Sequence, residues 1–144
     1  MIDGVTNAGA IPVLERLVQF AGQRHRLITD NVANLSTPGY RPVGVSVDAF
    51  LEQLGEAIDA RRQRHGAAGG DLEIEDTPGV RFTSAGVLLD PQPAGENILF
   101  YDGNDRNLER IMQDLVENFM TFRTAAELLR NRFELINTAI RERI

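Results

Sequence analysis

Carboxylates crowd residues 71–76 and are the side chains best placed to do chemistry in this chain. They are Asp71, Glu73, Glu75 and Asp76. Carboxylate oxygens are ligands that Ca²⁺ and Mg²⁺ accept, but an EF-hand loop also needs a fixed ligand spacing and a turn glycine. The segment has neither, so we interpret it as a solvated acidic loop.

The histidines give no stronger sign of a site. His25 and His65 lie far apart, and the chain contains no cysteine. Transition-metal sites are built mainly from clustered histidine and cysteine. No Ser, His and Asp set has a recognisable motif spacing, and no glycine-rich phosphate loop follows a predicted strand. We therefore predict no enzyme, no metal and no cofactor, and we expect His25 to be partly buried and His65 to be solvated.

The composition favours one domain that works through its surfaces. The chain has 144 residues, 42% of them hydrophobic, and a formal net charge of −6. Nucleic-acid binding favours a clustered basic patch, whereas the basic residues here are dispersed arginines. No apolar run approaches the roughly 18 residues of a transmembrane helix. We expect neither a nucleic-acid partner nor membrane insertion.

The N-terminus lacks the basic and apolar regions of a secretory signal peptide. If the protein leaves the cytoplasm, we expect it to use another route. Apolar residues concentrate at 11–35 and 108–140, whereas residues 59–81 are rich in glycine, alanine and charge. This distribution predicts a mainly α fold with two long amphipathic terminal helices and a middle that is poor in core.

The first helix is predicted over residues 11–36, after residues 1–10, which we expect to be mobile. Its apolar residues alternate spacings of three and four, as in a helical seam, with His25 at the one interrupted position. The seam consists of Ile11, Leu14, Val18, Ala21, Ile28, Val32 and Leu35.

A sharp turn ends this helix. The ring of Pro38 disfavours helical geometry at Thr37. Pro38 and Gly39 suit the central positions of a type II turn, with Gly39 at positive φ. Tyr40 then offers a large amphipathic anchor.

Residues 37–107 form the middle segment. It holds this turn and a shorter helix at about 48–64, which Asp48 is placed to cap. The apolar face of that helix comprises Phe50, Leu51, Leu54 and Ile58. A glycine-rich linker at 66–70 follows, and then an irregular or small-β part over 71–103 that contains a second Thr-Pro-Gly turn at 77–79.

The C-terminal helix, residues 108–144, is the strongest element, and Asn107 is a suitable N-cap for it. Its seam comprises Leu108, Met112, Leu115, Phe119, Phe122, Ala126, Leu129, Phe133, Ile136 and Ile140. Three phenylalanines exceed what a two-stranded coiled coil usually accommodates, which favours a multi-helix bundle. A second apolar flank is expected to remain available for a neighbour: Ile111, Val116, Ala125 and Ala139.

Neither helix can bury its seam alone, because helix stability comes mostly from packing an amphipathic face. We expect the two to pack as a coiled-coil-like hairpin and to leave surfaces for heterologous, propagating contacts. A self-contained helical hairpin is the simpler alternative. A soluble coiled-coil adaptor or an export-chaperone module that binds a partner helix is another.

Residues 31–40 and 97–143 resemble the flagellar basal-body rod protein family, and within it the proximal rod subunits. The N-terminal signature reads Asn31-x-Ala33-Asn34-x-x-Thr37-Pro38-Gly39-Tyr40. Residues 102–112 are similar to the entry to the family's last helix, although Ile111 stands where glutamate is usual and adds an apolar flank. Residues 60–96 carry no such resemblance.

The resemblance implies a structural subunit that polymerises with other rod proteins into the helical tube of the flagellar drive shaft. It further implies a place in the rod, in the periplasmic space, reached through the flagellar type III export apparatus without a cleaved signal peptide. The implied partners are other rod subunits, the adaptor between the MS ring and the rod, and further copies of the chain. No cofactor is implied.

Overall fold

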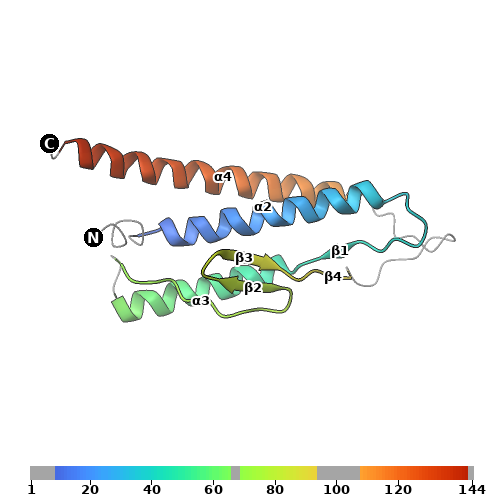
Figure 1. The fold of residues 1–144 in the computed structure, drawn as a ribbon, viewed down its shortest axis with the longest axis horizontal. Coiled ribbons are helices and arrows are strands. Elements are labelled where there is room, and N and C mark those ends of the chain that lie inside the picture. The colour runs from blue at the N-terminus through green and yellow to red at the C-terminus, as the bar shows by residue number, and fades with distance from the viewer. Residues whose placement is uncertain (1–8, 66–68, 94–107, 143–144) are drawn as a thin grey trace.

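The computed structural model describes residues 9–65, 69–93 and 108–142 (Figure 1). The helices are α2 (Ile11–Asn34), α3 (Val47–His65) and α4 (Leu108–Arg141). The strands are β1 (Val43–Gly44), β2 (Val80–Thr83), β3 (Gly86–Leu89) and β4 (Gln92–Pro93). The predicted mainly helical fold, with two long helices and small strands between them, is confirmed.

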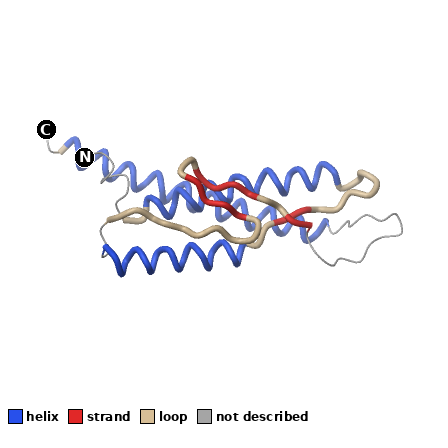
Figure 2. The backbone as a smooth tube through the Cα atoms, turned by 60° about the horizontal axis from the view of Figure 1, so that its bottom comes forward, coloured by secondary structure: helices blue, strands red, loops and turns tan. Residues whose placement is uncertain are grey.

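Helix α2 occupies the centre of the molecule. Helix α4 runs antiparallel along one side of it, and α3 with the strands lies along the other (Figure 1). Figure 2 shows the strands, in red, beside α3 and the long helices. Pro12 stands in the first turn of α2, where its fixed φ favours helix, and the helix ends at Asn34.

The hydrophobic core lies between α2, α3 and the β2–β3 hairpin. It is built from Phe20, Phe50, Leu54, Val80 and Val87. The rings of Phe20 and Phe50 stack with their centroids 3.8 Å apart. The expectation of a core-poor middle is therefore wrong. Its core residues come from short segments that are far apart in sequence, so no periodic pattern reveals them.

Helix α3 buries one face against this core. Phe50, Leu54 and Ala57 are buried, whereas Leu51, predicted to lie on the apolar face, is 47% exposed. The backbone N–H of Ala49 donates to Ser46 Oγ at 3.1 Å. Ser46 therefore caps α3 in place of the predicted Asp48, because the helix begins at Val47 and Asp48 lies inside its first turn.

Arg61 is buried at the far end of α3 and ties three parts of the chain together. Its guanidinium donates to the carbonyl of Gly70 and to the carbonyl of Gly9, each at 2.8 Å. The entry to α2, the end of α3 and the following loop are thus held at one side chain.

The strands form two small antiparallel ladders. In the hairpin Val80 faces Leu89 and Thr83 faces Gly86, and β1 pairs with β4. The second Thr-Pro-Gly turn leads into β2: Val80 N–H donates to Thr77 O at 3.0 Å, and Gly79 has a φ of 87°. Leu72–Ile74, which alternate apolar and polar residues, form no strand.

Some predictions fall outside the described residues. These are the N-cap role of Asn107, most of the mobile segment at 1–10, part of the glycine-rich linker and the apolar run at 97–101. Across the described ranges, every helix falls short of the length and apolarity that a membrane span requires.

Candidate functional site

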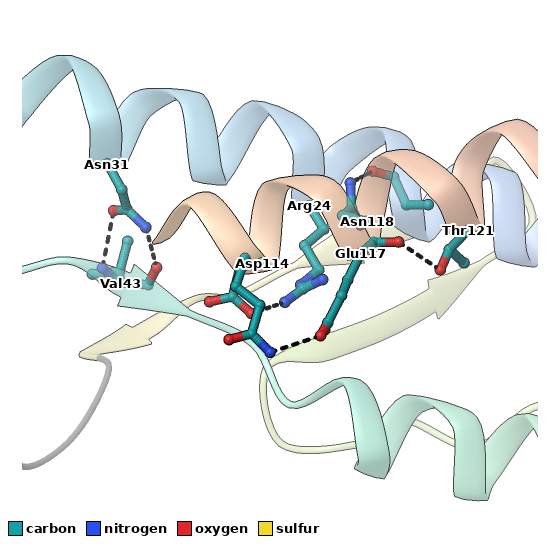
Figure 3. A network of polar contacts seen from close by, with 9 residues as sticks. Arg24, Asn31, Val43, Asp114, Glu117, Asn118 and Thr121 are labelled. Atoms are coloured by element: carbon teal, nitrogen blue, oxygen red, sulfur yellow. Dashed lines mark hydrogen bonds and ion pairs between the residues drawn. The ribbon is translucent and has the colours of Figure 1, made fainter. Parts of the chain in front are cut away.

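Asn31 fastens the chain after the turn onto α2 (Figure 3). Its Nδ2 donates to Val43 O at 2.7 Å, and its Oδ1 accepts from Val43 N–H at 3.1 Å. The same Oδ1 accepts a 2.8 Å hydrogen bond from the Tyr40 hydroxyl. One buried amide thus binds both backbone groups of a residue in β1, and the first and last residues of the Asn31–Tyr40 signature form a single unit.

The turn between them has the predicted geometry. Tyr40 N–H donates to Thr37 O at 3.1 Å, and Gly39 has a φ of 73°. A Cβ at Gly39 would meet no atom within 4 Å, so glycine is required here by the backbone conformation and not by space. The type II turn at Pro38 and Gly39 is confirmed.

The rest of the signature faces outward or closes the helix. Asn34 Nδ2 donates to Asp30 O at 2.9 Å and its own carbonyl accepts from Thr37 N–H. Ala33, Thr37 and Pro38 are exposed. Burial raises the pKa of the Tyr40 phenol, and the negative charge of Asp30 raises it further.

The contact between α2 and α4 rests on buried residues that recur every seven positions in both helices. They are Leu14, Ala21 and Ile28 on α2, and Ile111, Asn118 and Ala125 on α4. Asn118 Nδ2 donates to Ala21 O at 2.9 Å, and Arg24 pairs with Asp114 at 2.8 Å (Figure 3). Antiparallel packing from these contacts sets Ile28 opposite Ile111 and Leu14 opposite Ala125.

The buried face of α4 differs from the one expected. Ile111 and Ala125, assigned to the flank left for a neighbour, lie inside the monomer, so that expectation is wrong for these two residues. Val116 and Ala139, the other two residues of the flank, are exposed as expected. The physical reason is size. Ala21 and Ala125 let the helix backbones approach closely, whereas a phenylalanine at the centre of the contact would hold them apart. The large side chains of the predicted seam therefore lie at the edge of the α2–α4 contact or outside it.

The predicted seam residues of α4 fall into two sets. Leu115, Ala126, Leu129 and Ile136 are partly buried. Leu108, Met112, Phe119, Phe122, Phe133 and Ile140 are exposed. On α2, Val18 and Val32 are partly buried, as is Leu35 just after the helix end. His25 is exposed, so its expected partial burial is wrong. Sequence reasoning also did not assign Asn118 to the seam, because a polar residue does not register in an apolar pattern.

We define the outer face of α4 by seven large apolar residues that share one side of the helix and are each between 37% and 58% exposed. They are Leu108, Met112, Val116, Phe119, Met120, Phe133 and Ile140. In the described part of the chain, the large exposed apolar residues outside α4 are Leu51 and Leu88. A patch of this kind on a protein surface marks an interaction site.

The edges of the β2–β3 hairpin, by contrast, are covered. The Gln23 amide donates to Val87 O and accepts from Leu89 N–H, which occupies the edge of β3. On the other strand, Phe82 N–H donates to Asp76 Oδ1 at 2.7 Å. Strand addition by a partner needs free backbone groups, so the described surface favours contacts through the helices.

The acidic segment has structural contacts. Glu73 pairs with Arg64 at 2.6 Å, and Asp76 accepts the hydrogen bond from Phe82 N–H in β2. In the described ranges no three His, Cys, Asp or Glu side chains gather where a metal ion would bind.

Comparison with known proteins indicates the kind of protein to which this chain is similar. No protein-family model matches the chain. The flagellar basal body rod protein FlgB of Bacillus subtilis strain 168 is 23% identical over 133 residues, 92% of this chain and 94% of the relative. FlgB of Cereibacter sphaeroides is 28% identical over 120 residues, covering 82% of this chain and 83% of the relative. FlgB of Borrelia hermsii is 25% identical over 137 residues, 92% of this chain and 96% of the relative.

Together these relatives support the FlgB family. The resemblance to flagellar basal-body rod proteins that the two ends of the sequence predict is thereby confirmed. The similarity to FlgB also covers most of the chain, and so extends well beyond the two ends.

Proposed function

We propose that this chain is a structural subunit of the bacterial flagellar basal-body rod and acts by assembly, without catalysis. The observation that carries the proposal is the outer face of α4. Its large apolar side chains are exposed, and no helix in the described part of the monomer covers them although α2 packs directly beside them. Similarity to FlgB rod proteins along most of the chain supports the flagellar rod as that assembly.

In this proposal the chain belongs to the proximal rod and polymerises with other rod proteins into the helical drive-shaft tube. The α2–α4 pair is the stiff unit that transmits torque, because buried contacts fix the position of one helix along the other. The signature turn is a brace, since Asn31 and Tyr40 hold the strands to α2. The family motif and the outer face of α4 thus have separate roles, one within the subunit and one between subunits.

The location and partners follow from the same family. The subunit passes through the flagellar type III export apparatus without a cleaved signal peptide and assembles in the periplasmic space. Its neighbours are other rod subunits and the adaptor between the MS ring and the rod. Neither nucleic acid nor the membrane interior is a partner.

The proposal is tested with two matched double variants in a motile strain that lacks its own copy of the gene. Met112→Gln with Phe119→Gln makes the outer face of α4 polar at residues that are 43% and 48% exposed. Leu51→Gln with Leu88→Gln is the control, because both residues are 47% exposed and lie away from α4. Exposed substitutions change stability by about 0.5 kcal/mol or less, so both proteins should unfold like the parent.

We expect isolated basal bodies to contain the parent and the control but to lack the α4 variant, and that strain to be non-motile. Absence of the parent protein from basal bodies would refute the assignment to the rod. Normal incorporation of the α4 variant would leave the rod assignment intact and exclude the outer face as the assembly surface.

A coiled-coil adaptor or export chaperone is the competing function, since it too would present an apolar helix face. It differs in location: a chaperone would remain in the cytoplasm, bound to an exported partner, and would not be found in basal bodies.

A further inference from the structure

Both methionines in the described part of the chain lie on the outer face of α4. The chain has three methionines, and Met1 falls outside the described residues. Met112 is 43% exposed and Met120 is 58% exposed, whereas the described hydrophobic core contains no methionine. Methionine commonly fills gaps in apolar cores and is also frequent at binding surfaces. The described methionines of this chain have the second placement.

The two thioethers are part of a continuous apolar row on the helix. Met112, Val116 and Met120 follow one another at intervals of four residues, which makes them neighbours along the helix surface. Val116 is 57% exposed, and Phe119, next to Met120 in the sequence, is 48% exposed. A polar group introduced at either sulfur would therefore interrupt the apolar outer face.

The described contacts within the monomer do not rest on these side chains. Helix α4 packs on α2 through Ile111, Asn118 and Ala125, which are buried. These three recur every seven residues on a different side of the helix from Met112 and Met120. A chemical change at the methionines therefore alters the outer face and leaves the buried contact as it is.

Hydrogen peroxide converts an exposed thioether into a sulfoxide. The O–O bond of the peroxide breaks, one oxygen forms an S–O bond with the methionine sulfur, and the other leaves as water. The sulfur loses two electrons and the peroxide gains them. The product is a polar, chiral side chain that disrupts apolar contacts. Because the chain contains no cysteine, no thiol competes for the oxidant within the subunit.

We propose that the outer face of α4 is a modification site at which peroxide, by oxidising Met112 and Met120, prevents the subunit from entering the rod. The inference rests on the proposed function, since it requires a neighbouring subunit to cover this face. On the free subunit the sulfoxide oxygen stays hydrated. In an apolar contact it loses that water without a hydrogen-bond donor in return, which is unfavourable. Oxidation between export and assembly therefore removes a copy from the pool that can assemble.

Competition between two forms of the chain tests the proposal. A motile strain without its own copy of the gene makes the parent and a Met112→Leu, Met120→Leu variant, both induced only after hydrogen peroxide is added. The ratio of variant to parent is measured by mass spectrometry in isolated basal bodies and in the free periplasmic pool. Both forms meet the same export apparatus and the same oxidised neighbours, so a change in the ratio reports on these two methionines alone.

Peroxide should enrich the leucine variant in basal bodies. When most free parent copies carry a sulfoxide, we expect the basal-body ratio, divided by the ratio in the free pool, to rise about tenfold over its value without peroxide. A tenfold change corresponds to about 1.4 kcal/mol. An unchanged ratio overturns the proposal, and so does a free pool in which Met112 and Met120 remain thioethers.

A Leu51→Met variant is the control for exposure alone. Leu51 is 47% exposed, between the values for Met112 and Met120, and lies on α3 away from the outer face. A sulfoxide at position 51 should be as frequent in basal bodies as in the free pool, whereas sulfoxides at Met112 and Met120 should be depleted in basal bodies. Equal fractions in the two pools at all three positions overturn the proposal, even if the leucine variant assembles poorly.

Purified chain treated with peroxide shows whether the fold is affected. Thermal unfolding followed by circular dichroism should give the same curve for the oxidised and the untreated chain, because both methionines are exposed. A lower unfolding temperature would mean that oxidation acts through the fold, which overturns the outer face as the site of the effect.

The outcomes separate this proposal from the proposed function. Absence of the parent from basal bodies without peroxide overturns the rod assignment itself. Presence of the parent there, with failure of any of the tests above, overturns the modification site and leaves the rod assignment standing.

Discussion

At the scale of single residues, two side-chain amides on α2 form hydrogen bonds to strand backbone groups that a neighbouring strand would otherwise bind. Asn31 binds the backbone N–H and C=O of Val43, and Gln23 binds the carbonyl of Val87 and the N–H of Leu89. A helix has no free backbone groups in its middle, so only side chains can satisfy a strand that packs against it. The asparagine at the first position of the flagellar signature, Asn31, is therefore explained by its hydrogen bonds to the backbone of Val43.

Truncation of Asn31 should destabilise the fold more than truncation of Asn34. In Asn31→Ala the Tyr40 hydroxyl and the backbone of Val43 lose their buried partner, which typically costs about 1–3 kcal/mol. Asn34 makes an exposed bond to Asp30 O, so Asn34→Ala should change stability by about 0.5 kcal/mol or less. Urea unfolding of both variants measures this, and equal losses would show that the brace is not energetically important.

The raised pKa of Tyr40 predicts a stability that depends on pH at the alkaline end. A phenol with a raised pKa in the folded state keeps its proton longer there than in the unfolded chain, whose value is 10.0. The contribution is therefore complete below that value and is lost as the pH rises through the folded pKa. Urea unfolding between about pH 8 and pH 11 should show this fall in the parent and a smaller fall in Tyr40→Phe.

At the scale of elements, the α2–α4 contact and the core between α2 and α3 are built from different kinds of residue. The centre of the α2–α4 contact has two alanines, Ala21 and Ala125, and one buried amide, Asn118, which is 2% exposed. A single polar residue in an apolar helix contact sets the register at some cost in stability. The larger apolar side chains, Phe20 and Phe50, stabilise the contact of α2 with α3 instead. Helix α4 can therefore be weakened while the core remains.

Asn118→Asp should release α4 and leave the core folded. The new carboxylate faces the carbonyl of Ala21 without a donor, and an uncompensated buried charge typically costs about 3–5 kcal/mol. Asn131→Asp is the control, because Asn131 is exposed on the same helix. Limited proteolysis should cut α4 of the first variant early while α2 and α3 stay protected. Simultaneous loss of all three helices would contradict the separation of pair and core.

At the scale of the whole molecule, the exposed apolar surface of the described residues is concentrated on one helix. Helix α4 has three buried residues among those described, Ile111, Asn118 and Ala125, and the last of them lies well before its end. The remaining length, to Arg141, projects along and past α2 (Figure 1). A monomer with this distribution is stable at its centre and incomplete at its C-terminal end, as expected of a subunit that assembles.

Hydrogen exchange of the dilute monomer should follow this gradient. Backbone amides of α2 and α3 around Phe20 and Phe50 should be the most protected, those near Asn118 intermediate, and those beyond Arg132 the least, because local opening follows the density of buried contacts. Protection beyond Arg132 should rise in the assembled state. Uniform protection along α4 in the monomer would mean that the helix needs no partner.

Local features of this protein were determined by the sequence alone. The seven-residue spacing of Leu14, Ala21 and Ile28 predicted a buried helix face, and Thr37-Pro38-Gly39-Tyr40 predicted a type II turn. Both depend on residues within a few positions of one another, where propensity and steric rules act directly. The signature and the C-terminal pattern were also sufficient to predict the family.

Tertiary structure alone decided where the core lies and which face of α4 is left free. Phe50, Val80 and Val87 belong to separate short segments, and only folding brings them onto Phe20. The free face depends on how closely α2 and α4 approach, which is set by Ala21 and Ala125 together with the Asn118 amide. Contacts between distant segments follow from the combined shapes of both partners, and no pattern along one segment contains that information.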